Sequence, residues 1–160
     1  MRDWIRDFRN TIETSSARLH AINESEAARR DGTAWSAKET LGHLIDSAAN
    51  NHARFVLAQM KDDLVFPGYE QDRWVDIQNY QEASWPQLVD LWTAYNRHLV
   101  HIMSYAADDK LSQRRSQHTL QTIAFETVKE TEPTTLEYLM KDYVGHLKHH
   151  LNQIFDEVAA

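Results

Sequence analysis

The chain of 160 residues contains no cysteine, and only four glycines and three prolines. Without cysteine, disulfide bonds, thiolate catalysis and cysteine-ligated zinc are excluded. Glycine and proline punctuate turns, so their scarcity predicts long uninterrupted elements, which points to helices rather than many short strands. A chain without disulfides suits a reducing compartment, and we therefore expect a cytoplasmic protein.

The chain also lacks any excess of positive charge, since its formal net charge is −7. Proteins that bind a phosphate backbone normally have a basic face, so the composition argues against nucleic acid and against an anionic membrane as partners. The apolar runs fall far short of a membrane span, and Met1–Asn10 has no apolar signal core. We expect a small-molecule substrate and one domain covering residues 1–160.

Apolar residues recur at helical spacing in four segments. The expected helices cover about Arg2–Asn23, Ser36–Met60, Ser84–Ala106 and the stretch from Pro133 to about Val158. Ser36 with Glu39, and Thr134 with Glu137, have the spacing of a capping box, which marks a helix start.

Two long connections separate these segments. The first, Asp62–Ala83, lies between the second and third helices and is long enough to cross the molecule. Four long helices so connected predict an all-α four-helix bundle with a crossover between helices two and three. In the second connection, Thr119–Val128 is rich in β-forming residues, so a short hairpin or extended strand is an alternative there.

Nine histidines are the unusual feature of the composition. On a helical wheel centred on Leu147, His150 lies about 60° and His146 about 100° to the same side, whereas His149 lies about 160° away. The i, i+4 spacing of His146 and His150 lets two imidazoles bind one ion, although such pairs also arise by chance. We therefore predict that this pair flanks the core and that His149 is solvated.

A catalytic zinc ion normally has three protein ligands, so a third must come from elsewhere. His43 lies off the apolar centre of the second helix, beside Ser47, Asn50 and Arg54, and periodicity alone leaves it either exposed or in a site. Among the other histidines, His52 is expected in the core or an interface, His98 and His101 form an alternative pair, and His20 and His118 carry no signal.

Two segments then resemble a known family. The sequence from Trp35 to Ser47 and that from Tyr143 to Ile154 are similar to the DinB-like (YfiT-like) superfamily, as are Arg54-Phe55 and the aromatic linker through Tyr69 and Trp74. The resemblance implies a four-helix bundle with the crossover described above. It also implies a Zn²⁺ or Ni²⁺ ion on one histidine of helix two and a His-x-x-x-His pair of helix four, here His43, His146 and His150. The assignment of His43 depends on the resemblance alone.

Several members of that family act in low-molecular-weight thiol chemistry, including bacillithiol S-transferases and mycothiol-dependent isomerases. The resemblance therefore implies a metal-dependent transferase that activates a thiol co-substrate, and the chemistry of such an ion makes a hydrolase that activates water the alternative; in either case the attack is on a small electrophilic molecule. An ion on three neutral imidazoles keeps its full charge, which lowers the pKa of a bound water to about 7 and favours a thiolate. A homodimer is expected by analogy with similar proteins.

Other residues of the second helix are candidates for orienting a ligand. Asp46, Asn50 and Arg54 continue along one side from His43, although a solvated helix face explains them equally well. The alternative to an enzyme is a non-catalytic metal- or ligand-binding module or a structural dimer, with Tyr69, Trp74 and Tyr80 exposed for a partner. A fourth protein ligand on the metal would favour that alternative.

Overall fold

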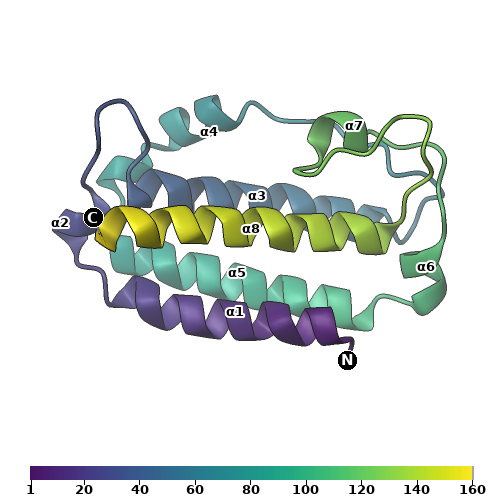
Figure 1. The fold of residues 1–160 in the computed structure, drawn as a ribbon, viewed down its shortest axis with the longest axis horizontal. Coiled ribbons are helices and arrows are strands. Elements are labelled where there is room, and N and C mark those ends of the chain that lie inside the picture. The colour runs from purple at the N-terminus through teal and green to yellow at the C-terminus, as the bar shows by residue number, and fades with distance from the viewer. Residues whose placement is uncertain (160) are drawn as a thin grey trace.

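Four long helices form a bundle in the computed structural model, which describes residues 1–159 (Figure 1). They are α1 (Asp3–His20), α3 (Ala37–Leu57), α5 (Trp85–Tyr105) and α8 (Leu136–Ala159). Helices α1 and α3 each pack against both α5 and α8, so α1 lies diagonally across the bundle from α3. The predicted all-α four-helix bundle is confirmed.

Helices α3 and α5 run in the same direction, and the chain between them returns along the whole bundle (Figure 1). This is the predicted crossover. It contains two elements that the sequence pattern did not predict, α4 (Gln71–Gln78) and the 3-10 helix η1 (Tyr80–Glu82), and both pack against α3. Asn79 joins them in a left-handed conformation, with φ of 51°. The crossover therefore forms a cover over one side of α3.

Three short helices complete the chain: α2 (Glu24–Ala27), α6 (Asp108–Ser112) and α7 (Leu120–Ile123). The alternative of a strand within Thr119–Val128 is wrong, because α7 lies there. The Thr119 hydroxyl accepts the Phe66 amide at 2.9 Å, while the Thr119 carbonyl accepts the amides of Thr122 and Ile123. These bonds hold the segment in a helical turn, so it is not free to pair as a strand.

A capping box was predicted at the start of both α3 and α8, and of these two only the one at α3 is present within residues 1–159. Ser36 and Glu39 form the expected capping box, with the Ser36 amide donating to the Glu39 carboxylate at 2.9 Å. The box expected from Thr134 and Glu137 is wrong, because Thr135 accepts the amide of residue 138 at 3.1 Å instead. Thr134 is buried and its backbone pairs with Arg115, which takes it out of the helix start.

One buried residue connects all four long helices. Tyr143 of α8 packs edge-on against Phe8 of α1 and Phe55 of α3, at ring-centre distances of 6.0 and 5.7 Å. Its hydroxyl donates a hydrogen bond of 2.6 Å to Oδ1 of Asn96 in α5. Burying this hydroxyl therefore costs little, because its donor is satisfied.

No helix within residues 1–159 is long and apolar enough to cross a membrane.

Candidate metal centre

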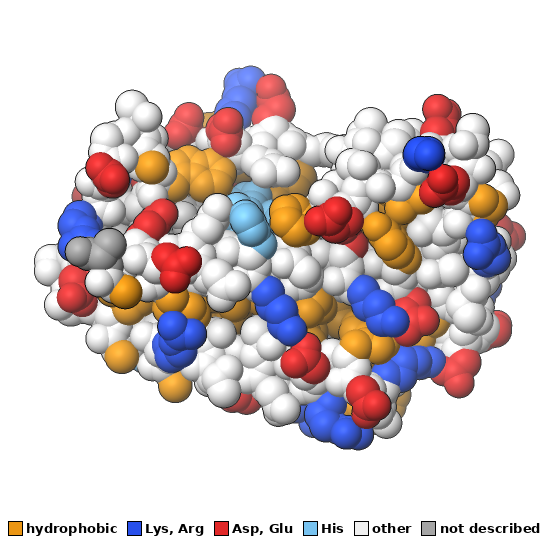
Figure 2. All heavy atoms as spheres, viewed as in Figure 1, with side chains coloured by type: hydrophobic (Ala, Val, Ile, Leu, Met, Phe, Trp, Pro, Cys, Tyr) orange, Lys and Arg blue, Asp and Glu red, His pale blue; other side chains and the backbone are white. Residues whose placement is uncertain are grey.

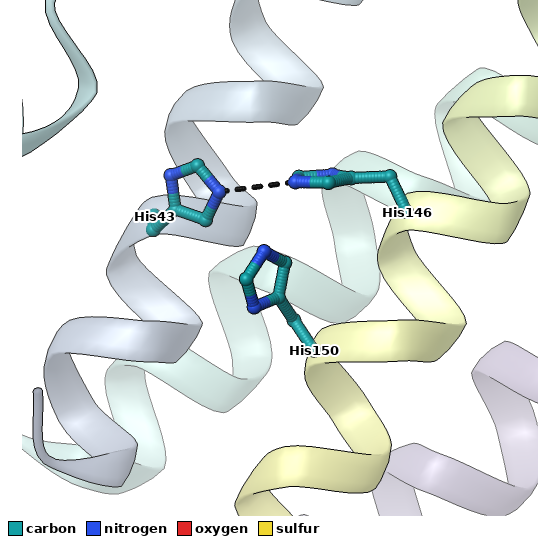
Figure 3. Close-up of side chains that lie close together, drawn as sticks. All are labelled: His43, His146 and His150. Atoms are coloured by element: carbon teal, nitrogen blue, oxygen red, sulfur yellow. Dashed lines mark hydrogen bonds between the residues drawn. The ribbon is translucent and has the colours of Figure 1, made fainter. Parts of the chain in front are cut away.

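Three histidines converge between α3 and α8 (Figure 3). His43 comes from α3, and His146 and His150 lie one turn apart on α8. One ring nitrogen from each lies within 4.8 Å of the other two. The two Nε2 atoms of His43 and His146 are 3.2 Å apart, and the His150 ring centre lies 4.8 Å from that of His43. This arrangement is one that can hold a metal ion.

The spacing fits the donor set of a tetrahedral site. Zinc–imidazole bonds of about 2.0–2.1 Å place two nitrogen ligands of a tetrahedron about 3.3 Å apart. The measured 3.2 Å between His43 and His146 matches that separation. Only three histidines and no carboxylate make up the cluster among the described residues, so the protein would leave a coordination position open.

Burial keeps these imidazoles neutral. Burial, with a smaller contribution from charge on His150, lowers the pKa of His43 to about 4 and that of His146 to about 3. The pKa of His150 is also lowered, again chiefly by burial. Because a neutral imidazole has a free lone pair, all three side chains are ready to bind a cation at neutral pH without first losing a proton.

Two neighbours fix the rings of the cluster. The indole of Trp35, just before α3, lies 5.3 Å from the His43 ring centre, whereas the buried Nδ1 of His43 has no hydrogen-bond partner among residues 1–159. Nδ1 of His150 lies 2.6 Å from Oε1 of Gln153. Donation from this Nδ1 leaves the Nε2 lone pair of His150 directed toward the cluster, and such outer bonds orient metal ligands.

Replacing Gln153 by Ala is therefore expected to weaken zinc binding about tenfold, because His150 would lose the bond that sets its tautomer. The measurement is competition for zinc with a chelating dye. Asn152→Ala is the matched control on the same helix, since Asn152 lines a different surface pocket, toward α1, and not the cavity beside the cluster. Equal affinities of the two variants would show that Gln153 does not orient His150.

A cavity of about 370 Å³ lies beside the histidines. In Figure 2, histidine atoms reach the surface near the middle of this face, with hydrophobic side chains beside them. Both α8 ligands line the cavity, and apolar and polar residues from α3, the crossover, α7 and α8 complete its wall, among them Arg54, Tyr69, Ile123, Phe125, Leu139 and Asp142. The cavity has the size of a small-molecule site.

The three candidate residues beyond His43 lie in different surroundings. Asp46 is buried, and its Oδ1 accepts hydrogen bonds of 2.7 Å from Tyr80 and Gln78, so it holds the crossover rather than facing the cavity. Burial raises the pKa of Asp46. Asn50 is half-buried and donates to the Asp46 carbonyl at 2.9 Å. Of the three, Arg54 alone lines the cavity.

The alternative of a solvated helix face does not hold for Asp46 and Arg54, which are buried, whereas Asn50 is half-buried. Residues 37–48 are all buried, because α4, η1, α5 and α8 pack around this part of α3. His43 is accordingly 1% exposed. Tyr80, predicted as an exposed aromatic residue of the linker, is buried as well, whereas Trp74 is 39% exposed.

The remaining histidines contribute no ligand atom to the cluster, although His149 lines the cavity and its ring centre lies 5.2 Å from that of His150. His149 is exposed on α8, and Phe125 lies 5.3 Å from its ring centre. His52 is half-buried between α3 and α5, with Nδ1 3.3 Å from the Tyr95 hydroxyl. His98 and His101 stack on the exposed side of α5 at 6.3 Å. His118 is buried and bonded to the Glu132 carbonyl.

Sequence reasoning missed several cavity residues. Asn51 and Asp142 gave no signal because polar residues at single positions of a helix are ordinarily solvated. Asp142 is half-buried, and its two oxygens accept the amides of Phe125 and Glu126 at 2.9 and 2.7 Å. Phe125 itself follows α7 in a connection with no periodic pattern. The placement of these residues depends on contacts between distant segments.

No curated protein matches the chain. Among solved structures, YfiT from Bacillus subtilis is similar, with a TM-score of 0.74 and 19% sequence identity over 98% of this chain and 87% of YfiT. That protein is described as a probable metal-dependent hydrolase with an unusual four-helix bundle topology. The family model of the DinB superfamily matches residues 7–154. Because this match spans almost the whole sequence, the chain belongs to the DinB superfamily.

Proposed function

We propose that this protein is a metal-dependent enzyme that binds one divalent ion through His43, His146 and His150. The observation that carries the proposal is the approach of three neutral ring nitrogens to within 4.8 Å of one another. Removing imidazoles from water costs free energy, and the Nε2 atoms of His43 and His146 have no hydrogen-bond partner among residues 1–159 except each other. A shared cation compensates that cost.

The open side of the cluster favours catalysis over a structural role. Structural zinc sites are closed by four protein ligands, whereas catalytic sites keep one position for water or substrate. Here the cluster has three members, and the cavity of about 370 Å³ is lined by His146 and His150. A small molecule in that cavity would lie next to the ion.

When bound, the ion would supply Lewis-acid activation of a nucleophile at neutral pH. We infer attack by water or a low-molecular-weight thiol on a small electrophilic substrate. The description of YfiT as a probable hydrolase supports water. The chain has no cysteine, so in thiol transfer the co-substrate would bring the sulfur. The chain's own part is to hold the ion on rigid helices and to shape the cavity.

Metal analysis of the untagged protein, purified without chelator, tests the proposal. We expect about one equivalent of zinc or nickel in the wild type, and its loss in His43→Ala and His146→Ala, because two imidazoles bind the ion too weakly to survive purification. His149→Ala should keep the metal, since that side chain is exposed and outside the cluster. Absence of metal even after reconstitution of the wild type would reject the proposal.

A further inference from the structure

Arg54 of α3 is a buried cation without a carboxylate partner. The residue is 6% exposed, and its guanidinium forms no ion pair within the described residues. Two of its N–H groups have protein acceptors: Nη2 donates to the Pro67 carbonyl at 2.9 Å, and Nη1 reaches Oδ1 of Asn51 at 3.5 Å. A guanidinium has five N–H donors, so most of its donor capacity is not taken up by these two acceptors.

Burying an unpaired guanidinium costs free energy unless a group of opposite charge binds to it. Buried charges in proteins are normally paired, because the loss of hydration outweighs what neutral carbonyl groups return. Burial lowers the pKa of Arg54, and the only charged influence that opposes this lowering comes from Tyr69. Burial in turn raises the pKa of Tyr69 to about 12, so the phenol is neutral at pH 7 and supplies no counter-charge.

The position of Arg54 indicates where its partner would lie. Arg54 lines the same cavity as His146 and His150, and Ile123, Phe125 and Leu139 give that cavity an apolar part. The carboxylate in the cavity wall, Asp142, accepts two backbone amides and forms no ion pair with Arg54. Arg54 and the two α8 histidines therefore line one cavity, whose wall also contains apolar side chains.

We propose that Arg54 binds the anionic end of the substrate, so that the enzyme acts on small organic acids with an apolar body. A carboxylate or a phosphate matches the planar donor fork of arginine. The acid group would anchor the molecule at Arg54 while the electrophilic group lies at the histidines. The position of the electrophilic group at the histidines rests on the proposed function, whereas the anion site at Arg54 does not require the metal.

A matched pair of small molecules with the same hydrocarbon chain, one charged and one neutral, tests whether binding depends on the negative charge. We would titrate butyrate, its neutral analogue butyramide, and inorganic phosphate into ¹⁵N-labelled protein, with and without zinc. Binding would be followed by NMR through the backbone amides of cavity residues such as Ile123 and Phe125, which every variant retains, and in the wild type also through the Arg54 Nε–H resonance. Butyrate should bind at least about tenfold more tightly than butyramide, because a hydrogen bond to a charged partner is the stronger kind. A phosphate response without a butyrate response would identify the anion as a phosphate and would support the site equally.

Variants then assign the effect to one side chain. Arg54→Met should remove the preference for butyrate, while Arg97→Met should keep it, because Arg97 is an exposed residue paired with Glu13. Arg54→Lys, which keeps the charge but loses the fork, should bind butyrate several-fold more weakly than the wild type. If Arg54→Met does not fold, the comparison of butyrate with butyramide on the wild type still decides.

Two results would overturn the inference: equal affinity for butyrate and butyramide together with no binding of phosphate, or an unchanged preference for the anion in folded Arg54→Met. Metal analysis of the same samples keeps the two proposals apart. A charge preference in protein that binds no metal would leave the anion site standing and reject the metal enzyme. One equivalent of metal without a preference for the anion would reject the anion site and leave the proposed metal enzyme standing.

Discussion

Zinc is expected to raise the melting temperature of the wild-type protein by roughly 10 °C and to leave that of His43→Ala unchanged. A ligand present at about 1,000 times its dissociation constant stabilises a folded protein by about 4 kcal/mol, and about 1 kcal/mol corresponds to roughly 2–4 °C in a chain of this size. The shift requires that zinc bind the folded state alone. We expect this because the folded state alone brings together His43 and His146, which are 103 positions apart in the sequence.

Differential scanning calorimetry with and without zinc measures this shift, each variant being compared with itself. His149→Ala is the matched control, because it removes one imidazole from the same helix but leaves the cluster intact. It should show the wild-type shift. A shift of equal size in His43→Ala would mean that zinc binds elsewhere, and would contradict the assignment.

Gly42→Ala should lower the free energy of unfolding by about 1–3 kcal/mol, the usual range for overpacking a core. A Cβ atom at Gly42 would lie 2.1 Å from Cδ2 and 2.3 Å from Cγ of Tyr80. The ring cannot simply turn away, because its hydroxyl is held by Asp46 at 2.7 Å. The clash outweighs the gain in helix propensity of about 1 kcal/mol that alanine normally brings.

Gly145→Ala provides a control of opposite sign. Gly145 lies in α8, is exposed, and has no atom within 4 Å of an added Cβ. This substitution should stabilise the protein by about 0.5–1 kcal/mol through helix propensity alone. Urea unfolding followed by circular dichroism measures both variants. A Gly42→Ala protein as stable as the wild type would show that Tyr80 and the crossover do not pack tightly on α3.

The long helices could be predicted because each carries its own periodic signal. Ser36 and Glu39 marked the start of α3 from local hydrogen bonding alone. The short helices α4 and α7 could not be predicted, because neither is long enough to show a periodic pattern of apolar residues. Their positions depend on contacts with distant residues, α4 with α3 and the segment of α7 with Phe66.

The candidate site also contains residues that their own helix predicts and residues whose surroundings depend on distant segments. The spacing of His146 and His150 on one helix selected them, whereas the burial of His43 could not be obtained from its own helix. A helical wheel compares a residue with apolar neighbours on the same element, and the cover over α3 consists of the distant residues 71–82. Arg54 was among the candidates, but its lack of an ion-pair partner is a property of the assembled fold.

The wide separation of the three ligands along the chain also sets the order of events in folding. Two lie in the final helix and one in α3, so the site exists only after α8 has packed against α3. Contacts between such distant segments form late, because closing a long loop costs entropy before the contact returns any stability. We therefore expect metal uptake to follow, rather than nucleate, the folding of the bundle, and the bound ion to act chiefly by slowing unfolding.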